Sequence, residues 1–149
     1  MTDGPSKATI SAWARLARVQ QQALRSIERA LKGAGLPPLA WYDVLLELER
    51  TNERGLRPFE LERAMLLAQY NLSRLIDRLE ASGYVERVSC EDDGRGHLIA
   101  ITASGRAMRR RMWPVYARAI EDAIGRHLVA AEIRSLDVLL GVLLERQAG

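Results

Sequence analysis

The sequence has a single cysteine, Cys90, among its 149 residues, so no disulfide can form within the chain. It also has no apolar run near the ~18 residues that a membrane-spanning helix needs. Residues 1–9 are polar and lack the apolar core of a signal peptide. These absences predict a cytoplasmic protein with no membrane partner.

Histidine is almost as scarce, since only His97 and His127 occur, and they fall on different predicted elements. The sequence contains no Gly-x-Ser-x-Gly elbow, no phosphate-binding loop and no cluster with metal-ligand spacing. One cysteine and two distant histidines cannot make a zinc site within one chain without carboxylates. We therefore predict that the protein is not an enzyme and has no catalytic residue, metal site or cofactor.

Lysine occurs only at Lys7 and Lys32, so nearly all the positive charge is carried by arginine, and the net charge is +3. Arginine is suited to bidentate recognition of phosphate and guanine. On composition alone, however, a solvated basic surface explains this charge better than nucleic-acid binding does. The pattern of residues along the chain has to decide between the two.

The most informative stretch runs from residue 56 to 105 and begins with two predicted helices. The first starts at Pro58, because proline suits a first helical turn whose amide has no partner inside the helix. A turn follows at residues 66–68, although it lacks the glycine often found there. The second helix is predicted over residues 69–82, and Gly83 ends it. Its apolar residues recur at helical spacing: Leu72, Leu75, Ile76 and Leu79.

After Gly83 the pattern changes to that of a two-stranded hairpin. Residues 84–90 are predicted to form one strand and residues 97–101 the other, with 56–57 as a minimal third strand. The tip between the two long strands, residues 91–96, is charged and bears two glycines that permit close approach. It has nothing to bury, so we expect it to project into solvent or towards a partner.

This order of elements, and several residues within it, resembles the MarR-type family of bacterial winged-helix transcription factors. The clearest match is Asp93 and Arg95 in the hairpin, then Ile101-Thr102 where the family has Leu-Thr, then Gly105. Residues 73–80 and 83–87 also fit the family pattern. Two departures are Gly94, where arginine is common, and the opening at 68–70, where Ser or Thr is common. The resemblance implies a winged helix-turn-helix whose flanking helices interlock to build a homodimer.

The flanking segments support dimerisation independently of the resemblance. Helices are predicted over 10–31, 39–50, 103–127 and 130–146, with a kink before Pro114 because proline removes a helical hydrogen bond. The last helix is apolar nearly all round at its centre, so we expect it to be buried on more than one side. The basic run at Arg106 and 109–111 is interpreted as a solvated helix face.

We therefore predict a mainly α fold with a small β-wing, in one domain spanning residues 1–149. Within it, 10–35 and 103–146 are the dimerisation helices, and 36–102 is the winged helix-turn-helix module that binds DNA.

The polar face of the second helix and the hairpin supply the candidate DNA contacts. Asn and Gln side chains can pair with adenine, and Arg74 with guanine, in a major groove. Arg95 can enter a minor groove, or pair locally with Asp92 or Asp93. The alternative for the helix is an ordinary solvated face, and for His97 a solvated strand residue. The predicted DNA-binding residues are Gln69, Tyr70, Asn71, Ser73, Arg74, Arg78, Arg95 and His97.

The resemblance also implies a pocket for a small-molecule effector between the dimer arms and the winged module. Apolar core or dimer packing is the alternative explanation for each of its six candidates: Trp13, Trp41, Tyr42, Met112, Trp113 and Tyr116. Peroxide-sensing family members place a reactive cysteine near the N-terminal helix, whereas Cys90 is flanked by carboxylates that raise the pKa of a thiol. We interpret Cys90 as structural.

Taken together, the sequence predicts a sequence-specific regulator of transcription that binds double-stranded DNA. It would act as a homodimer on a palindromic operator, as a repressor that an effector releases. The alternative is a winged-helix module that binds protein and not DNA. Such a module would keep the apolar faces but lose the polar recognition face and the basic tip, so Arg74 and Arg95 argue against it.

Overall fold

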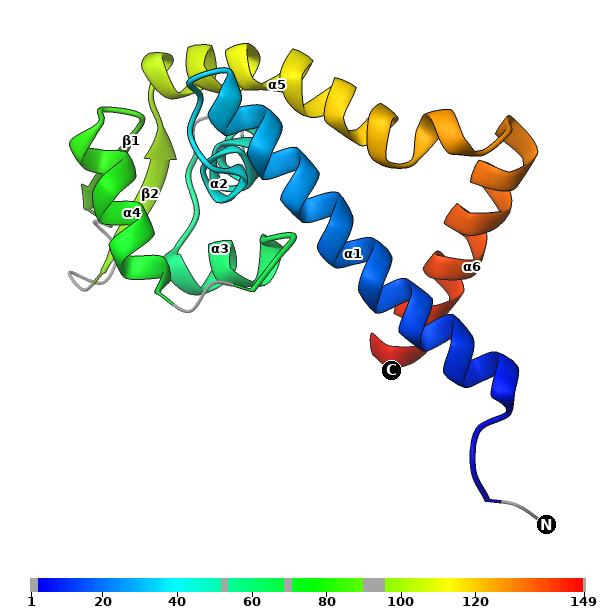
Figure 1. Cartoon of the computed structure of the whole chain (residues 1–149). Coiled ribbons are helices and arrows are strands. Elements are labelled where there is room, and N and C mark those ends of the chain that lie inside the picture. The colour runs from blue at the N-terminus through cyan, green and yellow to red at the C-terminus, as the bar shows by residue number, and fades with distance from the viewer. Residues whose placement is uncertain (1–2, 52–53, 69–70, 90–95, 149) are drawn as a thin grey trace. The chain divides into compact units, whose positions relative to one another are not determined.

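The computed structural model describes residues 3–51, 54–68, 71–89 and 96–148, and it is mainly helical with one small sheet (Figure 1). This confirms the predicted fold class. Gln69, Tyr70, Cys90 and Arg95 lie outside the described residues. The elements in chain order are α1 (Lys7–Gly33), α2 (Leu39–Glu49), α3 (Pro58–Ala64), α4 (Leu72–Ala81), β1 (Val85–Ser89), β2 (His97–Ile101), α5 (Ala103–Ala123), the 3₁₀ turn η1 (Gly125–His127) and α6 (Ala130–Ala148).

The chain divides into two compact units, which are described separately. One unit comprises residues 1–30 and 116–149, and the other comprises residues 31–115. The second unit contains α2, α3, α4, the sheet and the first part of α5, and is called the winged unit below. Within the described parts of both units, no helix is long and apolar enough to cross a membrane.

The sheet of the winged unit is an antiparallel hairpin. Val85 is paired with Ile101 at its base, and Ser89 with His97 towards its tip. Leu56 adds an isolated bridge to Ile99, with backbone N···O distances of 2.9 and 2.7 Å in the two directions. The two predicted strands of the hairpin are therefore confirmed, while the minimal third strand predicted at 56–57 is reduced to this single bridge at Leu56.

The core of the winged unit lies where α2, α3 and α4 meet the sheet. From α2, Val44, Leu45 and Leu48 are completely buried. The other completely or almost completely buried side chains come from α3, α4, β2 and α5: Leu61, Ile76, Leu79, Ile99 and Met112. Burying a side chain of this size contributes about 1.5–3 kcal/mol. This packing leaves the opposite face of α4 outside, as the apolar spacing of that helix predicted.

The two helices of the helix-turn-helix begin differently from each other. Helix α3 starts at Pro58 as predicted, and Glu60 Oε1 accepts the backbone N–H of Arg57 at 3.0 Å. Helix α4 starts at Leu72, so the predicted start at residue 69 is wrong. Asn71 precedes the helix as its N-cap, and its Oδ1 accepts the backbone N–H of Arg74 at 3.1 Å. Asparagine is among the residues that best cap a helix in this way.

The unit formed by residues 1–30 and 116–149 exposes much of its apolar surface. No residue of α6 is buried in the single chain, and Leu139 and Leu144 are 63% and 73% exposed. On α1, Trp13 is 68% exposed. The expectation that α6 is buried on more than one side is therefore wrong for the isolated chain, because its own chain supplies too little surface to cover it.

Helix α5 also departs from the prediction at its end. It runs through Pro114 and stops at Ala123, after which η1 occupies residues 125–127, whereas the sequence predicted one helix to residue 127. The kink expected before Pro114 stays a prediction.

A close backbone contact joins the base of the hairpin to α5. Thr102 Oγ1 accepts the N–H of Gly105 at 3.1 Å and donates to the carbonyl of Gly83 at 2.6 Å. A Cβ on Gly105 would collide with the carbonyl oxygen of Tyr84 and lie 2.8 Å from Ile101 Cγ1. Only glycine fits at residue 105 without moving the backbone.

We expect Gly105→Ala to lower the free energy of unfolding by about 1–3 kcal/mol, the usual cost of forcing an extra methyl group into a packed site. Urea denaturation checks this. Gly33→Ala is the matched control, because nothing lies within 4 Å of a Cβ there. If Gly105→Ala is as stable as Gly33→Ala, the structure accommodates the extra methyl group at residue 105 with no loss of stability, and the prediction is wrong.

Candidate nucleic-acid interface

Helix α4 presents a polar face to solvent. Ser73, Arg74 and Arg78 are exposed, while Ile76 and Leu79 on the other side are buried. Asn71 is also exposed, but its side-chain oxygen is engaged in capping the helix. His97 is exposed at the start of β2. The structure thus brings Asn71, Ser73, Arg74 and Arg78 together on one helix.

One arginine on the hairpin fixes α4 against β1. Arg87 Nη2 donates to Asp77 Oδ1 at 2.6 Å, and Arg87 Nη1 pairs with Glu80 Oε1. The hydrogen bond with Asp77 is the main reason that the pKa of the Arg87 guanidinium is raised. Exposed ion pairs of this kind contribute about 0.2–1 kcal/mol each.

The ion pairs of Arg87 also change the charge of α4. The helix carries two acidic side chains, Asp77 and Glu80, and Arg87 pairs with both, so that its single positive charge offsets half of their negative charge. Arg74 and Arg78 therefore set the sign of the potential on the exposed face. Sequence analysis missed this role of Arg87, although two carboxylates three residues apart on a helix, followed by an arginine on the next strand, are a detectable signal.

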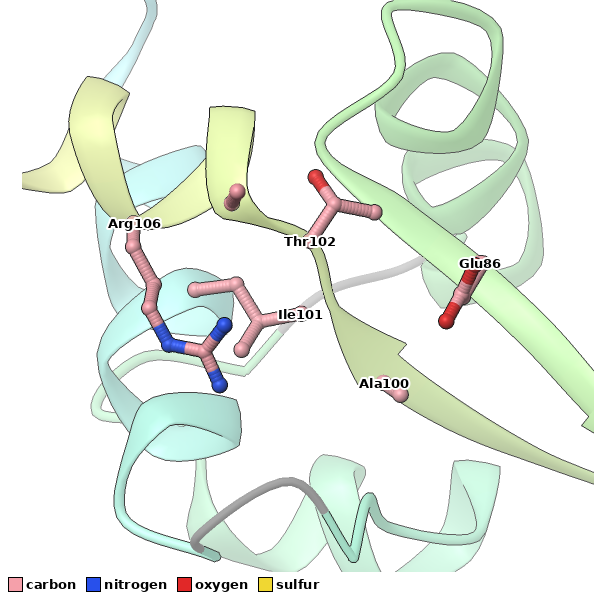
Figure 2. A pocket seen from close by; sticks show the side chains of 6 residues that line it. Glu86, Ala100, Ile101, Thr102 and Arg106 are labelled. Carbon is pink, nitrogen blue, oxygen red and sulfur yellow. The ribbon is translucent and has the colours of Figure 1, made fainter.

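Two open hollows lie on the winged unit. One, of about 300 Å³, lies between α3, α4 and the sheet, and its lining includes Phe59, Ser73 and Arg87. The other, of about 420 Å³, lies at the junction of the hairpin with α5. Figure 2 shows the Arg106 side chain extending from α5 past Ile101, with Glu86 on β1 on the other side of the junction.

Neither hollow is lined by the six predicted effector residues. In the winged unit, the Tyr42 ring stacks on Trp113, with centroids 6.1 Å apart and an interplanar angle of 21°. Trp41 meets Tyr84 edge to face at 6.0 Å, and Met112 is completely buried. Trp13 and Tyr116 belong to the other unit. The effector pocket stays a prediction.

Arg109 departs from the solvated face expected for the basic run. Its Nη1 donates to the hydroxyl of Tyr42 at 3.4 Å, and its Nε pairs with the carboxylate of Glu49. Burial acts to lower the pKa of Arg109, but these two partners outweigh it and the pKa is raised. Arg109 therefore joins α5 to α2, and it is not a solvated charge. In the described part of the chain, no three His, Cys, Asp or Glu side chains are grouped to hold a metal ion.

These features define a winged helix-turn-helix protein, and comparison with known proteins shows which family it resembles. Residues 34–96 match the model of the MarR family. The multiple antibiotic resistance protein MarR of Escherichia coli K12 is 30% identical over 83 residues, which are 56% of this chain and 58% of that protein. The transcriptional activatory protein BadR of Rhodopseudomonas palustris is 36% identical over 91 residues, which are 60% of this chain and 49% of that protein.

The match to these curated relatives spans only about half of their length, whereas a solved structure matches almost throughout. A MarR family transcriptional regulator from Streptomyces coelicolor, determined in complex with DNA, is 25% identical with a TM-score of 0.83. The alignment covers 97% of this chain and 94% of that one. Residues 34–96 therefore resemble the MarR family, and the fold of the chain is that of this MarR family regulator.

Proposed function

We propose that the protein regulates transcription by binding double-stranded DNA in a sequence-specific way, as a homodimer on a palindromic operator. The observation that carries the proposal is the exposed polar face of α4, with Arg74 and Arg78 on it, in a MarR-family winged unit. Its site of action would be the cytoplasm, where the DNA is. The relative from Streptomyces coelicolor solved with DNA supports the same function.

The geometry of α4 suits a major groove. A helix fits the width of that groove, and side chains in its first turns reach the base edges. Ser73 and Arg74 occupy the first turn of α4, and Arg78 lies one turn later. Because Arg87 pairs with Asp77 and Glu80 and offsets half of their charge, these acidic groups repel the phosphates less. Of the predicted contacts beyond α4, His97 at the hairpin would meet the backbone, and Arg95 a minor groove.

The apolar surface outside the winged unit supports the homodimer. Large apolar side chains of α1 and α6 are exposed in the single chain, among them Ile10, Trp13, Leu139 and Leu143. Contiguous exposed apolar surface on this scale marks an association site. A second copy of the chain exposes the same apolar side chains, so a two-fold interface can bury the apolar surfaces of both copies.

We propose further that the dimer acts as a repressor and that a small molecule releases it. Repression requires only that the bound dimer occupies DNA that the polymerase needs, whereas activation requires an additional contact with the polymerase. The stacked Tyr42 and Trp113, with Trp41 nearby in sequence, provide aromatic surface of the kind that ligand pockets use. Deleting the gene should raise transcription from the operator's promoter; a fall would mean that the protein is an activator, as the name of BadR describes that relative.

Nuclease footprinting on the DNA upstream of the protein's own gene tests the proposed function. Because each subunit has one recognition helix, we expect two symmetric half-sites about one helical turn apart. Protection of a single short asymmetric site would contradict the dimeric mode. Absence of protection on this region and on a library of random duplexes would favour a module that binds protein.

Analytical ultracentrifugation at micromolar concentration should find a dimer. Leu139→Glu combined with Leu143→Glu should raise the dimer dissociation constant by at least about tenfold, because each buried leucine contributes about 1.5–3 kcal/mol. Arg146→Gln, at the polar end of α6, is the control. A stable monomer of the unsubstituted chain would refute the homodimer.

Arg74 is the residue that we expect to read a base. If it pairs bidentately with guanine, Arg74→Ala should cost about 1–3 kcal/mol on the operator and less on random duplex, so the specificity ratio falls. Titrations of both duplexes at one salt concentration measure this. The control is Arg110→Ala on α5, which should leave the ratio unchanged. Equal losses of affinity on both duplexes would show that Arg74 contacts phosphate, and that Gln69, Asn71 or Ser73 contacts the base.

A further inference from the structure

Asp43 is a carboxylate in an otherwise apolar part of α2. It is 7% exposed, and among the described residues it is the one buried side chain that carries a charge. Its neighbours along the helix, Tyr42 and Val44, are buried apolar residues. A charged group in such a place is costly unless specific hydrogen bonds compensate it.

The partners of Asp43 lie 23 residues later in the chain, in the turn of the helix-turn-helix. Its Oδ2 accepts the backbone N–H of Leu66 at 2.6 Å. The backbone N–H of Leu67 also acts to lower the pKa of this carboxyl. Both amides belong to the segment between the end of α3 and the start of α4, which contains no glycine.

The Leu66 side chain is 67% exposed, so burial of that side chain does not anchor the turn, whereas Met65 and Leu67 beside it are partly buried. Hydrogen bonds from N–H groups to a carboxylate are shorter and stronger than neutral ones. The attachment of this turn to α2 therefore depends on Asp43.

The anchor is itself held firmly. On α2, Glu49 pairs with Arg109 of α5, and the hydroxyl of Tyr42 accepts from the same arginine. Val44, Leu45 and Leu48 are completely buried. Asp43 thus connects the turn to a part of the winged unit that cannot shift without breaking the core.

The charge on Asp43 opposes folding and does not promote it. Burial raises the pKa of this carboxyl, and Glu47 raises it further, while the N–H groups of Leu66 and Leu67 and the charge of Arg50 lower it less. A raised pKa means that the folded chain favours the neutral acid, so its contribution to stability grows as the pH falls through that pKa. For stability alone, a neutral side chain would serve better.

We propose that Asp43 is a positioning residue for sequence recognition, which holds the turn before α4 so that Arg74 and its neighbours meet the bases in one fixed arrangement. This inference rests on the proposed DNA-binding function. Base contacts require placement within about 0.5 Å, whereas electrostatic contacts to phosphate tolerate more movement. A turn that is free to move would present the competent arrangement for only a fraction of the time, and affinity for the operator would fall by that fraction.

The test compares Asp43→Ala and Asp43→Asn with the unsubstituted chain, in titrations of the operator and a random duplex at one salt concentration. Asp43→Ala should weaken operator binding by about tenfold to a hundredfold, the equivalent of one charge-assisted hydrogen bond, and random binding by much less. Asp43→Asn keeps one acceptor oxygen and should lose less. Glu47→Gln is the matched control: Glu47 is one turn along α2 and pairs with exposed Arg50 at 3.0 Å.

Amide hydrogen exchange, followed by NMR without DNA, provides an independent measurement. The amides of Leu66 and Leu67 should be protected in the unsubstituted chain and in Glu47→Gln, and should exchange faster in Asp43→Ala. Urea midpoints identify any variant that fails to fold, and Asp43→Asn, which conserves side-chain size, keeps the test informative if Asp43→Ala is unstable.

The outcomes separate this inference from the proposed function. If the unsubstituted chain binds no DNA, the proposed function fails, whatever the exchange data show. If it binds its operator and the folded Asp43 variants keep the same ratio of operator to random affinity, the positioning role is refuted. This holds whether neither affinity changes or both fall equally, and in the second case Asp43 only maintains the fold.

Discussion

The winged unit depends on the burial of α2. This short helix is covered on most of its circumference, with Leu39, Tyr42, Val44, Leu45 and Leu48 all removed from solvent. Helix α3 and strand β2 pack against it (Figure 1). The hydrophobic gain from this burial fixes the framework on which the exposed face of α4 is displayed. From this buried helix, Tyr42, Asp43 and Glu49 reach α5 and the turn before α4, so the position of α2 fixes theirs.

The electrostatics of the exposed face of α4 depend on a residue of another element. A net charge of +3 is too small to attract a polyanion strongly by itself. The arrangement matters more, because Arg87 on β1 pairs with both acidic side chains of α4 and offsets half of their charge. Arg74 and Arg78 then leave the helix and its ion pairs with a net positive charge. The same ion pairs tie the hairpin to α4, so the two elements proposed to touch DNA have a fixed relative position.

Local patterns predicted the elements of this fold well, and long-range contacts were the part they could not predict. The spacing of Leu72, Leu75, Ile76 and Leu79 identified α4, and the change of period after Gly83 identified the hairpin. The start of α4 was misplaced because Asn71 was considered as a base contact and not as a cap. Asp43 and Arg109 were missed because their partners are 23 and 67 residues away in sequence, a distance over which periodicity carries no information. The burial of α6 was overestimated because an apolar pattern does not say which chain will cover it.

The hairpin is closed at its base by hydrogen bonds between residues 83–84 and Thr102, which also bonds to Gly105. Thr102 links the carbonyl of Gly83 to the N–H of Gly105, and its own N–H donates to Tyr84 at 3.1 Å. These hydrogen bonds hold the two ends of the hairpin together independently of the residues that connect its strands. Doubling the length of a flexible loop costs only about 0.6 kcal/mol of chain entropy. The chain between β1 and β2 can therefore change in length and sequence during evolution while the helices of the winged unit keep their structure.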